Sequence, residues 1–183
     1  ARIDSGIFSS TKFLTNLQEN SNGIYTCSDG KKILIKAPTD ITTIDLTDVY
    51  LIADGAFSGC SNLTDVNIPS SVEYIGQNAF SSTPFLQNLT ENSNGVYTRD
   101  DGKKIVLGYQ DKSITSFDFT DVRVIADGHI FYGTKLQNVV LDEGIKSIGS
   151  YTFCGCDDLA SVSIPSSVKY LGSYAFQGCK NLE

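Results

Sequence analysis

The chain has 183 residues, of which 40% are hydrophobic, so it is long enough and apolar enough to bury a core. Its 21 acidic and 14 basic residues give a net charge of −7, and an acidic surface repels phosphate backbones, which argues against a nucleic acid partner. No apolar run approaches the roughly 20 residues needed to cross a bilayer, so we expect no membrane insertion within the chain, and the oligomeric state stays open.

The first feature along the chain is a long repeat. The segment 13–35 returns at 85–107, and sixteen of the 23 aligned positions are identical. Each copy contains two short apolar runs around an Asp-Gly pair, Asp29-Gly30 and Asp101-Gly102, which is a strong β-hairpin signal. The sequence therefore predicts two inserted β-hairpins, at about 20–38 and 92–111.

A shorter period of 22 or 23 residues runs inside the long one. It is clearest near the end of the chain, where Leu136, Leu159 and Leu182 are spaced by 23 residues. Seven units begin at Leu14, Ile41, Leu63, Leu86, Ile114, Leu136 and Leu159, with fragments at both ends. This periodicity predicts a single solenoid domain over residues 1–183, cut from a longer repeat array.

The unit that begins at Leu63 illustrates how one coil is expected to fold. The alternation of Val66 and Ile68 predicts a short strand with one buried face, which Pro69 helps to end. A second short extended run follows, and then Ala79 and Phe80 predict a brief helical turn. Stacked coils pair their strands into a parallel sheet, one strand per repeat, with the helical turns on the other side. One core column is expected to hold Phe8, Phe57, Phe80, Phe153 and Phe176.

Polar residues alternate with the buried positions of each first strand. Because successive side chains of a strand point to opposite faces, positions 3 and 5 of each unit are expected to point away from the core. The binding face predicted in this way consists of Thr43, Asp45, Asp65, Asn67, Asn88, Ser116, Asp118, Asn138, Ser161 and Ser163. These short polar side chains suit hydrogen bonding across a broad partner.

Candidate catalytic and metal-binding residues are few. His129 is the only histidine, so any nucleophilic pair with Ser or Cys must use it, and we interpret it as an irregular repeat position at a turn. In the unit from Ile114, alignment places His129 and Ile130 at the usual Ala and Phe positions and Gly133 at the usual Cys position. The sequence predicts no catalytic residue, no metal site and no cofactor.

Three cysteines, Cys60, Cys156 and Cys179, share one repeat position. The simpler interpretation is a column of small buried thiols that fill a tight turn. A disulfide between Cys156 and Cys179 is the alternative, because neighbouring strands lie only about 5 Å apart.

Three segments of the repeat, IPSSVEYIGQNAF at 68–80, IPSSVKYLGSYAFQGC at 164–179 and GAFSGCSNL at 55–63, resemble the BspA-like leucine-rich repeat family. The resemblance covers nearly the whole chain, and the inserted segments resemble hairpins that interrupt such repeats in this family. It implies a leucine-rich-repeat solenoid in a secreted or surface-displayed protein of a host-associated bacterium or a protist. It also implies roles in adhesion and in the binding of host proteins.

Two functions remain in contention at this point. The first is a non-catalytic extracellular or cell-surface module for binding or adhesion, which recognises a host protein or glycan through the repeat surface or the two hairpins. The alternative is a structural stalk or spacer that presents another domain. An enzyme would require His129 or an acidic pair to be essential, and the sequence argues against it.

Overall fold

The computed structural model describes residues 18–19 and 22–183. The predicted unit start at Leu14 and the core position of Phe8 lie outside these residues. The chain divides into two compact parts, residues 1–88 and residues 89–183, which we call unit 1 and unit 2. Each repeat of 22 or 23 residues is called a coil from here on. No helix of the described residues is both long and apolar enough to span a bilayer. A single solenoid over residues 1–183, cut from a longer array, stays a prediction.

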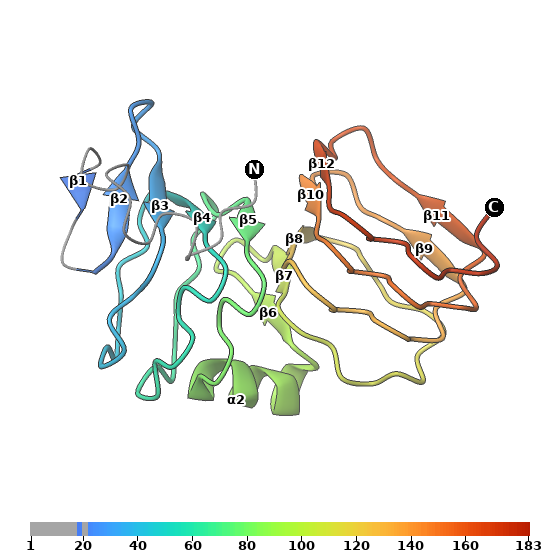
Figure 1. Cartoon of the computed structure of the whole chain (residues 1–183), viewed down its shortest axis with the longest axis horizontal. Coiled ribbons are helices and arrows are strands. Elements are labelled where there is room, and N and C mark those ends of the chain that lie inside the picture. The colour runs from blue at the N-terminus through green and yellow to red at the C-terminus, as the bar shows by residue number, and fades with distance from the viewer. Residues whose placement is uncertain (1–17, 20–21) are drawn as a thin grey trace. The chain divides into compact units, whose positions relative to one another are not determined.

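Unit 1 contains a five-stranded sheet in the order β1-β2-β3-β4-β5 (Figure 1). Its strands are β1 (Gln18–Glu19), β2 (Ile24–Thr26), β3 (Lys32–Leu34), β4 (Val49–Ile52) and β5 (Tyr74–Ile75). The first three strands pair antiparallel, and β3, β4 and β5 pair parallel. The β2–β3 pair is the first predicted hairpin, and it turns at Gly30, whose N–H donates to the Cys27 carbonyl over 2.9 Å.

The first strands of unit 2 form the second predicted hairpin, and parallel pairs follow it. The hairpin strands β6 (Val96–Thr98) and β7 (Lys104–Val106) pair antiparallel, and β7 pairs parallel with β8 (Val122–Ile125). Two more parallel pairs join β9 (Asn138–Val140) to β11 (Ser161–Ser163) and β10 (Ser147–Ile148) to β12 (Tyr170–Leu171). Both predicted hairpins are confirmed, and among the described strands parallel pairing joins some neighbouring coils but does not continue from β8 into the coil from Leu136.

Pairing between neighbouring coils mostly uses the second extended run, whereas the first was predicted. In the coil from Leu63, Tyr74–Ile75 forms β5 and residues 63–68 form no strand. Within the described residues, first runs of neighbouring coils pair with each other in the coils from Leu136 and Leu159, as β9 and β11, and the first run of the coil from Leu14 contributes β1, which pairs antiparallel with β2 of the same coil. In two other coils the Asp45 and Asp118 carboxylates accept N–H groups two residues later, over 2.9 Å in each case. Such local bonds compete with pairing between coils.

A helix, α2 (Pro84–Ser93), stands where a strand was predicted at the start of the coil from Leu86 (Figure 1). The Thr83 hydroxyl caps it by accepting the Leu86 N–H over 3.1 Å, and Pro84 fits the first helical turn, where its missing N–H costs nothing. The helix is followed by Asn94 and Gly95, both with positive φ. Asn88 therefore lies on a helix, and its predicted place on a strand is wrong.

The predicted aromatic column is confirmed inside each unit. In unit 1 the Phe57 ring stacks on Phe80 with centroids 4.8 Å apart. In unit 2 the rings of Phe131, Phe153 and Phe176 stack with successive centroid distances of 5.4 and 5.5 Å. The apolar residues of the Leu63 coil are also buried as expected, at Leu63, Val66, Ile68, Val72, Ile75, Ala79 and Phe80.

The coil from Ile114 departs from its sequence alignment by one residue. Phe131, not Ile130, occupies the Phe column, since its N–H donates to the Thr152 carbonyl as the Phe57 N–H donates to Ala79. Thr134, not Gly133, occupies the Cys position, and its hydroxyl lies 3.3 Å from the Cys156 sulfur. Compared with the coil from Ile41, this coil thus carries one extra residue before Phe131 and one fewer between Thr134 and Leu136.

Isolated hydrogen-bonded turns stand at the positions of the predicted helical turns. Ser81 N–H donates to the Asn78 carbonyl and Cys154 N–H to the Tyr151 carbonyl, three residues back in each case. The residue that accepts each bond has a positive φ, 56° at Asn78 and 58° at Tyr151. The positive φ precedes the two central residues of each turn, and it interrupts any right-handed helix that would run through it. Each predicted helical turn is therefore present as a single hydrogen-bonded turn and not as part of a longer helix.

Candidate binding surface

All ten residues of the predicted binding face are exposed to solvent, but the structure does not bring them into one sheet. Asn88 lies on α2. Six others lie on segments between strands, namely Thr43, Asp45, Asp65, Asn67, Ser116 and Asp118. Only Asn138, Ser161 and Ser163 lie on paired strands. The outward direction of the side chains agrees with the prediction, whereas the continuous sheet face does not. Their role in binding stays a prediction.

The β9–β11 pair is the part of the predicted face that forms an ordered surface. Val139 between the outward positions is 1% exposed, so this strand buries one side and presents the other. The Ser161 hydroxyl donates to the Asn138 side-chain oxygen of the neighbouring coil over 2.7 Å. Val140, at an outward position of β9, is 70% exposed. The pair therefore presents hydrogen-bonding groups beside an exposed apolar side chain, a combination typical of binding surfaces.

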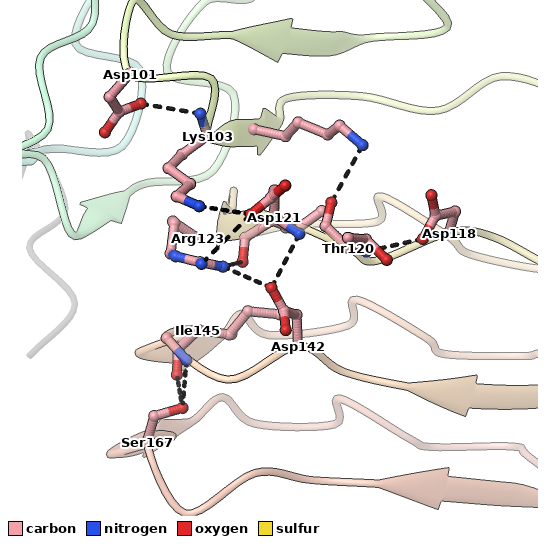
Figure 2. Close-up of polar contacts among 12 residues, drawn as sticks. Asp101, Lys103, Asp118, Thr120, Asp121, Arg123, Asp142, Ile145 and Ser167 are labelled. Atoms are coloured by element: carbon pink, nitrogen blue, oxygen red, sulfur yellow. Dashed lines mark hydrogen bonds and ion pairs between the residues drawn. The ribbon is translucent and has the colours of Figure 1, made fainter.

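Charged side chains connect the second hairpin to the following coils (Figure 2). Lys103, next to the hairpin turn, forms an ion pair with Asp121 over 2.5 Å. Arg123 on β8 bonds the Asp142 carboxylate of the next coil over 2.8 Å, and the same carboxylate accepts the Asp121 N–H over 2.9 Å. We call these four side chains the hairpin clamp. Because it ties three successive segments together, the clamp restricts movement of the hairpin against the coil beneath it.

The clamp depends on a charge at a position where the first copy of the long repeat has an aromatic residue. Arg123 corresponds to Tyr50 in the aligned segments TDVRVIAD and TDVYLIAD. Its guanidinium, together with the Asp121 N–H, lowers the pKa of the Asp142 carboxyl from its ordinary value. It also packs on Gly144, where a Cβ would approach the Arg123 Nε atom to 2.7 Å. The replacement of Tyr by Arg is the sequence signal for this cluster. It was missed because the prediction compared only the apolar positions of the repeat.

The cysteine column is confirmed as a set of free thiols. Cys60 and Cys156 are buried, and each thiol of the column bonds a carbonyl in the preceding coil. Cys179 bonds the Phe153 carbonyl over 3.2 Å, and burial raises the pKa of its thiol to about 11. Cys156 and Cys179 are not joined by a disulfide. A thiol with so high a pKa is a weak nucleophile at neutral pH.

The remaining chemistry centres on His129, whose side chain is exposed. Its ring stacks on Tyr151 with centroids 4.9 Å apart and meets Tyr132 edge to face at 5.2 Å. In the part of the chain that the structure describes, no Ser or Cys side chain is hydrogen-bonded to it. Nor do three or more potential metal ligands gather anywhere in residues 18–19 and 22–183. What these groups do offer is an aromatic surface.

Comparison with known proteins gives a family and several partly similar structures. The family model described as a BspA type leucine rich repeat region matches in six copies, over residues 1–100 and 108–183. No curated protein matches the chain. A leucine rich cell surface protein from Faecalibacterium prausnitzii is 21% identical, with 77% of this chain and 57% of that one covered and a TM-score of 0.34.

Two further solved structures are similar to the chain. A leucine-rich repeat protein from Bacteroides ovatus is 26% identical, with 93% of this chain and 39% of that one covered and a TM-score of 0.34. The T. pallidum leucine rich repeat protein is 19% identical, with 91% of each chain covered and a TM-score of 0.37. The chain thus spans 57% of the Faecalibacterium protein and 39% of the Bacteroides protein.

Proposed function

The chain belongs to the BspA-type leucine-rich repeat family, and from this premise we propose that it is a non-catalytic binding module, secreted or displayed at a cell surface. Its ligand is a host protein or a glycan, and recognition uses the outer surface of the repeats. No cofactor, metal or nucleic acid takes part. Adhesion to the ligand is the expected consequence when such a module is attached to a cell.

The ordered outer face of β9 and β11 is the observation that carries this proposal. Asn138, Ser161 and Ser163 are exposed on strands whose inner residues are Val139, which belongs to the core, and Val162, which is half-buried. Side chains on paired strands are held in fixed positions, so less conformational entropy is lost when a ligand binds them. The exposed Val140 adds an apolar contact in the middle of the polar group. Fixed polar groups around an apolar contact are the arrangement of a protein-binding surface.

The hairpin clamp supports the same proposal from a second place in unit 2. An inserted hairpin that projected freely would lose conformational entropy when it binds a ligand, and this loss weakens binding. The contacts of Lys103 with Asp121 and of Arg123 with Asp142 reduce that cost in advance. The second hairpin is therefore suited to serve as a rigid rim beside the repeat surface.

The proposal is tested by a binding screen on the whole chain. Immobilised protein is exposed to extracellular host proteins and to a glycan array, and each ligand found is measured against Ser163→Arg. This change places a long charged side chain on the outer face of β11 without entering the core, and we expect at least tenfold weaker binding, the result of losing about 1.4 kcal/mol. The matched control is Thr64→Arg, at an exposed position of unit 1.

The outcomes separate the candidate functions. Equal loss in Ser163→Arg and Thr64→Arg would assign the effect to added charge rather than to the β9–β11 face. A chain that binds no ligand in either screen would favour a stalk or spacer, with recognition located in another part of the protein. Turnover of a substrate that His129→Ala abolishes would overturn the non-catalytic assignment.

A further inference from the structure

An exposed row of aromatic rings crosses three successive turns of unit 2. The rings of His129, Tyr151 and Tyr174 stack in order, with centroid distances of 4.9 and 5.1 Å and interplanar angles of 23° and 24°. Tyr132 meets the His129 ring nearly at a right angle, at 85°. Tyr132 and Tyr174 are 49% and 56% exposed, so this aromatic row lies outside the core. In the described chain, none of its three phenol hydroxyls has a hydrogen-bond partner.

Two members of the aromatic row occupy a backbone conformation that is unfavourable for a bulky side chain. Tyr151 and Tyr174 have φ values of 58° and 60°. At the same place in the coils of unit 1 stand Gly55 and Asn78, with φ of 61° and 56°, and these residue types tolerate that region. Burial of the ring offsets this strain only in part, since Tyr151 is half-buried and Tyr174 is 56% exposed. Strained residues retained at the surface are a mark of function.

The core fixes the spacing of the aromatic row. Each stacked ring of the row lies two residues before a ring of the buried column formed by Phe131, Phe153 and Phe176. That column is stacked almost in parallel, with interplanar angles of 5° and 4°. The outer rings are therefore spaced regularly, one coil apart, because each is attached to the backbone close to a ring of the core column. A periodic and preorganised surface favours a ligand with a matching period.

The geometry points to a linear, uncharged glycan of equatorially linked pyranose rings as the ligand of the aromatic row. Each pyranose ring in such a chain advances the polymer by nearly the spacing of one coil, so successive sugars meet successive side chains. Because the rings stack on one another, each Tyr presents to a sugar its ring edge and its hydroxyl, which can hydrogen-bond the hydroxyls of the sugar. This inference rests on the proposed binding function and specifies the class of ligand.

An extended peptide and a charged polymer fit the aromatic row less well. On one face of an extended peptide, side chains recur about every 6.6 Å, which falls out of step with rings 4.9 and 5.1 Å apart. Within the described chain, no Asp, Glu, Lys or Arg side chain forms a hydrogen bond or ion pair with the row. A charged polymer would therefore lack a counter-charge in direct contact with these rings.

The test is a titration of the whole chain with neutral oligosaccharides, followed by calorimetry and by NMR of labelled tyrosines. Cellohexaose, chitohexaose and mannohexaose are the probes, and cellobiose tests the dependence on length. Tyr151→Asn and Tyr174→Asn remove a ring and install the residue that Asn78 already supplies at this backbone position, so the fold is expected to persist. Leu171→Ala, at an exposed apolar position on β12 of the same unit, is the matched control.

We expect one hexasaccharide to bind more tightly than the disaccharide, and each Asn variant to raise its Kd about five- to tenfold, the scale of one aromatic contact. Leu171→Ala should leave that Kd unchanged. The absence of heat and of tyrosine shifts with all three hexasaccharides at millimolar concentration would overturn the glycan assignment, as would equal binding by the Asn variants. If no oligosaccharide binds but the binding screen finds a host protein, the glycan assignment fails and the proposed binding function stands. If the chain binds neither an oligosaccharide nor a ligand of the screen, both proposals fail.

Discussion

Unit 1 and unit 2 build the same hairpin and following strand on nearly the same backbone. The β2–β3 and β6–β7 pairs have equal lengths and registers. Each pairing to the next strand carries the same irregularity, between Lys32 and Ile33 in one and between Lys104 and Ile105 in the other. The residues that the two copies of the long repeat share are therefore sufficient to determine this backbone.

The side chains around the two hairpins use different interactions on that common backbone. In unit 1 the Lys31 ammonium lies 5.0 Å from the centre of the Tyr50 ring. In unit 2 Arg123 replaces the Tyr and bonds Asp142, and the residue at the position of Asp142 in the unit 1 coil is Pro69. Two uncharged residues in one copy thus correspond to an ion pair in the other. The type of interaction around the hairpin can therefore differ between the two copies, provided that both residues at the contact are replaced together.

The largest expected effect tests whether the core column stabilises its own unit. Phe153→Ala removes the middle ring of the stack in unit 2 and should lower the free energy of unfolding by about 3–5 kcal/mol. Urea unfolding measures the loss, and hydrogen exchange locates it. Amides of β8, β10 and β12 should lose protection first. A loss below about 1 kcal/mol would mean that the column is not packed as described.

A second experiment tests the shared backbone of the two hairpins. At both Gly23 and Gly95 φ is positive, and a Cβ would collide with a backbone carbonyl, that of Lys36 or of Gly108. Gly23→Ala and Gly95→Ala should therefore cost similar amounts, about 2–4 kcal/mol each. Gly102→Ala is the control, because nothing lies within 4 Å of its added Cβ and only the φ strain of about 1–2 kcal/mol remains. Unequal costs at the two collision sites would break the equivalence of the hairpins.

A third experiment converts the contacts of unit 2 into those of unit 1. Arg123→Tyr and Asp142→Pro each leave one partner of the ion pair behind, and each should lower Tm slightly, by no more than about 3 °C. The double variant should lose less than the sum of the two single variants, because the remaining partner is removed as well. Differential scanning calorimetry of the four proteins gives this coupling. Additive losses would show that the two positions act independently.

The smallest expected effect is a pH dependence that the same ion pair contributes. The folded-state pKa of Asp142 lies below its ordinary value, chiefly because of Arg123. Its contribution to stability is therefore complete above the ordinary pKa of Asp, about 3.9, and is lost as the pH falls through the lower folded-state value. Urea midpoints between neutral pH and pH 3 should decline less in Arg123→Tyr than in the parent. An identical decline would assign the acid sensitivity to other carboxyls, such as Asp45 and Asp118, whose pKa values are also lowered, mainly by side-chain hydrogen bonds from Thr47 and Thr120.

The hairpins and the core positions could be predicted from the sequence because each depends on local or periodic information. Asp29-Gly30 and Asp101-Gly102 set their turns through nearby residues alone. The Phe column follows from a fixed spacing, which requires only that equivalent residues share an environment. The helix α2 was also encoded locally, at Thr83 and Pro84, but the repeat alignment outweighed those capping signals.

The candidate site was harder to predict, because exposure does not define a surface. All ten predicted residues are exposed, yet only Asn138, Ser161 and Ser163 share a paired sheet. The aromatic row was missed because Tyr132, Tyr151 and Tyr174 lie outside the apolar positions that define the repeat. Tyr at a coil position held elsewhere by Gly55 and Asn78 was the available signal.

The sequence by itself determined the repeat length, the inward residues and the two hairpin insertions, since these follow from periodicity and from turn chemistry. Only the tertiary structure decided which extended run of each coil pairs with its neighbour. Both runs have the alternation of a strand, and the choice depends on whether backbone groups of adjacent coils meet in register. The shift to Phe131 in the Ile114 coil was decided in the same way, because hydrogen bonds to the neighbouring coil fix which residue enters the stack.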